Sequence, residues 1–209
     1  MLKPNLIPDY EEFTHYWNAL ALENGLDGIY FVAPSSFPEK EAKELFKKGY
    51  SAVHSFRFEE SFSKLGGSKF TKRIKRKIQR TFKLNLKVEL NIYDYKAIIE
   101  NFVTEEDRNI IFYPTIYPSW DNSPRSGMRA LILENSNPEI FKMHVKKVLS
   151  IVKEKPYEHR IVFLKSWNEW AEGNYMEPDL KFGLQYLQSL KSEISAVNSS
   201  KNQTHLNDF

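Results

Sequence analysis

The chain has 209 residues, 41% of them hydrophobic, which suits one domain with a buried core. It contains no cysteine, which excludes disulfides, zinc–thiolate sites and thiol nucleophiles and fits a reducing compartment. The net charge is only +3, no apolar run approaches the ~20 residues of a membrane span, and the N-terminal residues do not resemble a signal peptide. We therefore expect a cytoplasmic protein, either soluble or peripheral at the inner face of the membrane.

The first quarter of the chain predicts alternating helices and strands. Apolar residues recur at spacings of three and four over 9–24, which predicts an amphipathic helix. A buried strand over 28–33, a short helix over 38–48 and a strand over 50–56 follow, separated by glycine and proline. Such alternation is typical of parallel βα units.

The next segment, 69–83, concentrates positive charge. It holds eight Lys or Arg residues and no acid, with an apolar residue at every fourth position, so the rest of the chain is net negative. A solvated helix face explains this pattern, and so does contact with an anionic membrane or with the phosphates of a sugar donor or lipid carrier. We expect no nucleic-acid partner, because no binding motif accompanies the run.

The remaining pattern continues the alternation. We expect a helix and a turn within 87–108, a strand over 110–116 interrupted by Pro114, and an amphipathic helix over 138–154. A strand over 160–166 and a helix over 178–194 complete the domain, 1–194. The polar, aperiodic segment 195–209 predicts a disordered tail.

Two of these strands run into clusters of aromatic and polar side chains. The apolar run from Ile161 to Leu164 is typical of a strand covered on both faces, and it leads into Trp167, Glu169 and Glu172. The carboxyl end of a parallel strand looks like this where it carries a site. Ordinary packing of the tryptophans, with the acids in the first turn of a helix, explains the same residues.

The two clusters carry a family resemblance. The segment Trp-Asn-Glu-Trp-Ala-Glu-Gly at 167–173, with Tyr175 and Glu-Pro-Asp at 177–179, resembles the closing motif of the WbsX-type glycosyltransferase family, also described as glycoside hydrolase family 99-like. The segment Trp-Asp-Asn-Ser-Pro-Arg at 120–125 resembles the other hallmark of that family. The two motifs stand in the family's order, and the resemblance extends loosely over 9–190.

The resemblance implies an α/β fold, a (β/α)8 barrel with its site at the carboxyl ends of the strands. About four parallel strands alternating with helices correspond to the C-terminal half of such a barrel. We therefore expect open parallel edges and an N-terminal barrel half that another chain supplies or that a truncation removed.

The resemblance also assigns site residues. In the similar endo-acting mannosidases, two glutamates at this spacing are catalytic, which makes Glu169 the candidate base toward a sugar 2-hydroxyl and Glu172 the candidate acid and base at the glycosidic oxygen. The candidate substrate-binding residues are tryptophans that could stack on sugar rings and polar residues that could bind hydroxyls, namely Trp120, Trp167, Trp170, Asp121, Asn122, Arg125, Asn168 and His54.

Several of these assignments have alternatives. Asp121 and Arg125 form an ion pair within their loop on another interpretation, and Asn168 orients a glutamate. Glu177 reads as a helix N-terminal residue before Pro178 rather than a third acid. We expect no metal and no cofactor, because no ligand spacing and no glycine-rich phosphate loop is present.

The leading functional prediction is a carbohydrate-active protein, a glycosyltransferase or glycoside hydrolase that acts on a mannose-like glycosidic bond in surface polysaccharide of the O-antigen type, including lipopolysaccharide. The alternatives are a truncated, non-catalytic remnant and a sugar-binding subunit that needs a partner.

Overall fold

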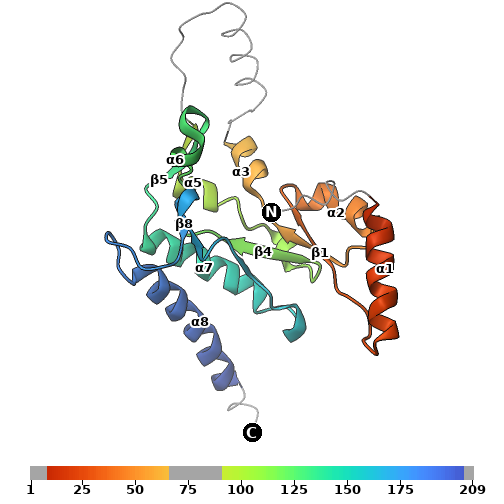
Figure 1. Cartoon of the computed structure of the whole chain (residues 1–209). Coiled ribbons are helices and arrows are strands. Elements are labelled where there is room, and N and C mark those ends of the chain that lie inside the picture. The colour runs from red at the N-terminus through yellow and green to blue at the C-terminus, as the bar shows by residue number, and fades with distance from the viewer. Residues whose placement is uncertain (1–8, 66–90, 205–209) are drawn as a thin grey trace, which may run out of the picture.

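The fold is an α/β arrangement in which short strands alternate with helices (Figure 1). A computed structural model describes residues 9–65 and 91–204. Short 3-10 helices, of three or four residues each, are labelled η. The elements are α1 (Tyr10–Glu23), β1 (Val32–Ser35), α2 (Pro38–Lys47), β2 (Ala52–Ser55), α3 (Phe58–Lys64), β3 (Asn91–Asp94), α5 (Tyr95–Ile99), η2 (Glu105–Arg108), β4 (Phe112–Ile116), α6 (Ser123–Ser126), η3 (Gly127–Arg129), β5 (Leu131–Glu134), α7 (Pro138–Val152), η4 (Tyr157–His159), β6 (Phe163–Leu164), β7 (Asn168–Glu169), η5 (Trp170–Glu172), β8 (Asn174–Tyr175) and α8 (Gln185–Thr204).

The main sheet has four strands in the order β1-β2-β4-β6, and all its pairings are parallel. It curls into half of a barrel with helices along it, and α1 and α8 lie on opposite sides of the molecule (Figure 1). This confirms the predicted fold class, half of a TIM-like barrel. Because the strands are parallel, their carboxyl ends meet at one edge, and the loops that follow β4 and β6 lie side by side.

The strand boundaries differ from the predicted ones. β1 begins at Val32 and continues through Pro34, which an edge strand tolerates because proline lacks an amide hydrogen for the ladder. β4 continues through Pro114, and its pairing with β6 begins only at Thr115. The segment 160–164 is partly exposed, with Ile161 at 41%, so the prediction of a strand covered on both faces was wrong. Its strand, β6, spans only Phe163–Leu164 and lies at the edge of the sheet.

A second, two-stranded parallel sheet joins β3 to β5. The sequence predicted only a helix and a turn around 87–108, and it predicted nothing for Leu131–Glu134. β3 has four residues, none of them fully buried, so its side chains carry no strand periodicity that a single sequence would reveal. The pairing between distant segments creates both strands.

The main apolar core lies between the sheet, α5, α7 and α8. Its fully buried members include Tyr95, Phe102, Tyr117 and Phe141. The face of α7 that the sequence predicted as apolar is buried there, through Val145 and its neighbours along the helix. A smaller core around Ala33, Val53 and Phe112 lies beneath α2.

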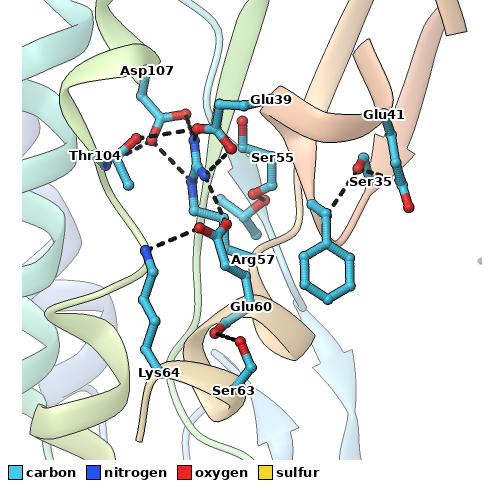
Figure 2. A network of polar contacts seen from close by, with 12 residues as sticks. Ser35, Glu39, Glu41, Ser55, Arg57, Glu60, Ser63, Lys64, Thr104 and Asp107 are labelled. Carbon is cyan, nitrogen blue, oxygen red and sulfur yellow. Dashed lines mark hydrogen bonds and ion pairs between the residues drawn. The ribbon is translucent and has the colours of Figure 1, made fainter. Parts of the chain in front are cut away.

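A buried ionic network lies beside the sheet, where Arg57 follows β2. Figure 2 shows its guanidinium pointing toward three carboxylates. The closest oxygens are those of Glu39 at 2.6 Å, Glu60 at 2.9 Å and Asp107 at 3.2 Å. Burial acts to raise the pKa of the Glu39 carboxyl, but hydrogen bonds and charge from Arg57 outweigh it, and the pKa is lowered overall. Arg57 thus ties α2, α3 and η2 together.

The two terminal helices differ from expectation in detail. α1 forms as predicted, but most of its apolar stripe is exposed, including Phe13, Tyr16 and Trp17, and its buried residues are Thr14 and Ala21. α8 begins at Gln185, seven residues later than predicted, and the helix reaches Thr204, past the predicted start of the tail.

The basic segment 69–83 lies outside the described residues. Among the described helices, none combines the length and the apolar character needed to cross a membrane.

Candidate functional site

The two motif segments meet at the carboxyl edge of the sheet. The backbone amide of Asp121 donates to the carbonyl of Glu172 at 2.8 Å, and the Ser119 hydroxyl donates to the carbonyl of Gly173 at 2.6 Å. Gly173 has φ +55°, and a Cβ at this position would lie 2.9 Å from the Asp121 carbonyl oxygen. Only glycine permits this left-handed turn at so close an approach. The contact between the motifs, more than forty residues apart in the chain, is therefore built into the backbone.

The second motif folds as a small antiparallel hairpin of β7 and β8. Asn174 is fully buried and anchors it, because its side-chain oxygen accepts from the Ser166 amide at 2.7 Å and its carbonyl accepts from the Ser166 hydroxyl at 2.6 Å. The Ser166 hydroxyl oxygen also accepts from the Glu169 amide at 3.2 Å. Paired residues of a hairpin share a face, so Asn168 and Tyr175 lie on one side, and Glu169 and Asn174 on the other.

The Glu172 carboxylate forms two ion pairs at the site. Its Oε1 lies 3.2 Å from Arg125 Nη1, and its Oε2 lies 3.6 Å from Lys165 Nζ, with 17% of the side chain exposed. Lys165 also lies over the ring of Trp120, 4.9 Å from its centroid. Two cations from two loops thus hold one carboxylate at the edge of the sheet. Lys165 is a site residue that the sequence motifs did not predict, although its position directly after the strand was a usable signal.

The first motif shapes its own loop. The Asp121 carboxylate accepts from the Ser123 amide at 2.8 Å, and the Asn122 side chain accepts from the Leu131 amide at 2.8 Å. Within the described residues, Arg125 pairs with Glu172 and not with Asp121. The two binding candidates Asp121 and Asn122 therefore use part of their polar capacity to fold the loop that presents Arg125.

Trp120 and His54 are placed differently from the prediction. Trp120 is only 8% exposed, and its ring packs on Phe58 in the main core, so it is a core residue in this chain rather than an open stacking surface. His54 is buried on β2, where its Nε2 contacts the Thr115 hydroxyl and its ring stacks on Phe163 at 4.1 Å. Burial lowers the pKa of His54 to about 4, so the ring is neutral at neutral pH.

The remaining tryptophans are exposed. Trp167 is 53% exposed, and its carbonyl accepts from the amides of Met176 and Glu177. Trp170 stacks on Tyr175 with ring centroids 3.7 Å apart, and its indole Nε1 donates to Glu177 Oε2 at 2.5 Å. The interpretation of Glu177 as a helix N-terminal residue was wrong, because no helix begins at Pro178.

Comparison with known proteins agrees with the motifs. The family model described as Glycosyltransferase WbsX matches residues 1–190. Proteins named "Uncharacterized protein WxcX" from two strains of Xanthomonas campestris pv. campestris are each 22% identical over 194 residues, which is 92% of this chain and 26% of the relative. The chain thus spans about a quarter of the length of these curated relatives. No solved structure matches. Because the family model covers most of the chain, the protein belongs to the WbsX glycosyltransferase family.

Proposed function

We propose that this chain carries the carboxylate site of a carbohydrate-active protein that makes or remodels a glycosidic bond in surface polysaccharide of the O-antigen type. The observation that carries the proposal is Glu172, held between Arg125 and Lys165 where the two family motifs touch. Family membership supports the carbohydrate class. The mannose-like sugar and the division of labour between the glutamates rest on the resemblance to the endo-acting mannosidases.

In this proposal the two glutamates have different tasks. Glu169 accepts the proton of the sugar 2-hydroxyl while the oxygen of that hydroxyl bonds to the anomeric carbon, and Glu172 gives its proton to the departing glycosidic oxygen. An acceptor hydroxyl then passes its proton to Glu172 as its oxygen attacks the anomeric carbon. The bond between that carbon and the 2-oxygen breaks, and Glu169 returns its proton to the 2-oxygen. The acceptor is a sugar hydroxyl in transfer and water in hydrolysis.

The test is turnover by purified protein carrying Glu172→Gln or Glu169→Gln. We would assay mannose-containing oligosaccharides and lipid-linked sugars by product analysis, with and without a polypeptide that supplies the N-terminal barrel half. Each variant should lose at least a hundredfold in kcat, because general acid–base catalysis typically contributes 10²–10⁴-fold. Glu44→Gln, at an exposed position on α2, is the matched control and should keep full activity. Full activity in Glu172→Gln would exclude the mechanism.

A second candidate is a sugar-binding subunit that acts only with a partner. It is favoured by β1 and β6, which are the edge strands of the sheet within the described residues, and by the exposed aromatic residues of α1. Further strands and helices of a barrel would pack at such edges. For such a subunit, Glu172→Gln leaves oligosaccharide binding intact and changes no turnover, with or without the N-terminal half. For the enzyme, the same substitution abolishes turnover. A remnant would neither bind nor turn over in either arrangement.

A further inference from the structure

The aromatic pair of Trp170 and Tyr175 forms an exposed shelf on the hairpin. The two rings are nearly parallel, at an interplanar angle of 14° and a centroid distance of 3.7 Å. Tyr175 covers one face of the indole, and Trp170 is still 48% exposed. Among the described residues, neither ring belongs to the two apolar cores. Packing of the core therefore does not explain why the pair is held in this orientation.

Two carboxylates fix the shelf from its edge. Glu177 accepts the indole N–H of Trp170, and its own amide donates to the carbonyl of Trp167 at 3.3 Å. Asp179 Oδ2 accepts from the Tyr175 hydroxyl at 3.3 Å, while Asp179 Oδ1 accepts the backbone amides of the following turn. Hydrogen bonds to an ionised acceptor are stronger and more directional than neutral ones. Both rings are thus held by acids that are themselves attached to the backbone.

An exposed indole face held in one orientation suits one ligand chemistry. The C–H bonds of a pyranose ring pack against the electron-rich face of an aromatic ring, and fixing the ring beforehand reduces the entropy lost on binding. The strand pairing places Tyr175 on the hairpin face opposite Glu169. A sugar ring on this shelf therefore lies on the other hairpin face from Glu169 and is not the ring on which Glu169 acts.

We propose that Glu177 is a positioning residue that holds Trp170 as a stacking subsite for a non-reacting pyranose ring of the saccharide substrate. The inference rests on the proposed function for the identity of the substrate. It differs from that function in its residues, its hairpin face and its effect, which falls on binding rather than on bond cleavage.

The test measures binding apart from turnover. Tryptophan fluorescence and calorimetric titrations with mannobiose, cellobiose and lactose would compare the wild type with Trp170→Ala, Glu177→Ala and Glu177→Gln. Glu177→Ala removes a preorganising contact and should raise the Kd for the bound disaccharides roughly three- to tenfold. Trp170→Ala should weaken binding at least as much, and Glu177→Gln, which keeps an acceptor oxygen, should recover most of it. Trp17→Ala, an exposed tryptophan on α1, is the control and should bind as the wild type does.

A second readout reports on the positioning itself. In the sugar-free protein, the indole N–H resonance of Trp170 should exchange faster with solvent in Glu177→Ala than in the wild type, and Glu177→Gln should restore protection. Where turnover is measurable, Glu177→Ala should raise KM and leave kcat unchanged. The inference is overturned if the wild type binds none of the disaccharides, or if Trp170→Ala leaves Kd unchanged, or if Glu177→Ala frees the indole without weakening binding. Glu172→Gln separates the two proposals, because it should abolish turnover and leave these Kd values unchanged.

Discussion

Replacement of Arg57 by Met should destabilise the protein more than any exposed charge substitution. Arg57 and Asp107 are both fully buried, and the guanidinium also contacts the carboxylates of Glu39 and Glu60. Methionine keeps the apolar stem of the side chain and removes the charge. Three carboxylates then remain beside one another, and the buried one loses the cation that compensates its desolvation.

The expected magnitude is large on the scale of protein stability. Breaking a buried ion pair by removing one partner costs about 3–5 kcal/mol, against a total free energy of unfolding of about 5–15 kcal/mol for a native protein. The surface pair of Arg108 and Glu154 supplies the matched control, since both side chains are roughly half exposed. Arg108→Met should cost far less than Arg57→Met, because exposed pairs are screened by water.

The assay is urea unfolding followed by tryptophan fluorescence, with midpoint and slope fitted for each variant. A double variant, Arg57→Met with Asp107→Asn, should recover part of the loss, because it removes the buried charge that was left without compensation. The reasoning is refuted if Arg57→Met lowers the free energy of unfolding no more than Arg108→Met does, or if the double variant is as unstable as the sum of the single variants predicts.

Three further predictions concern the site and the charge pattern. Gly173→Ala should lower the free energy of unfolding by about 1–3 kcal/mol, through backbone strain and the clash of the new Cβ with Asp121. Gly183→Ala should cost less, because φ there is +53° but the new Cβ would meet no atom within 4 Å. Equal urea midpoints for the two variants would contradict this. Burial lowers the pKa of His54 to about 4, so between pH 6.5 and 4 the unfolded chain binds a proton that the folded chain does not. As the pH decreases through this range, the free energy of unfolding therefore decreases by about 1.4 kcal/mol per pH unit from this group. His54→Gln should flatten that dependence in urea titrations from pH 7 to 4.5, and an unchanged slope would refute the assignment. The basic segment 69–83 should bind phosphatidylserine vesicles in a salt-dependent way, with about 1 kcal/mol of binding free energy per cation near the surface. Substitution of four of its cations by Gln should abolish sedimentation of the protein with the vesicles. Salt-independent binding would exclude this role.

The sequence predicted the parts of the fold that local periodicity controls. The apolar spacing of α1, α2 and α7 and the short runs at β2 and β4 were sufficient to place these elements and their alternation. The two motifs were also sufficient to predict that their segments lie together, since both follow strands whose carboxyl ends meet at one edge. These features depend on residues that are close together in the chain.

Other predictions failed where a distant segment decides the environment. Trp120 and Trp170 each belong to a family motif, yet Phe58 and Lys165 cover Trp120, while Trp170 stacks on Tyr175 and stays half exposed. His54 ends a strand in the sequence, but Thr115 and Phe163 of neighbouring strands enclose it. No local pattern distinguishes these outcomes, because burial is a property of the packed neighbours.

The sequence by itself determined the class of fold, the family and the carboxylates at the end of the sheet, because residue types and short-range spacing carry that information. Only the tertiary structure decided which groups those carboxylates face. It brought Arg125 and Lys165 to Glu172, turned Glu177 toward the indole of Trp170, and buried Arg57 among three acids. Pairings of this kind are set by how the strands and loops stack in space, because packing brings together side chains that lie far apart in the sequence.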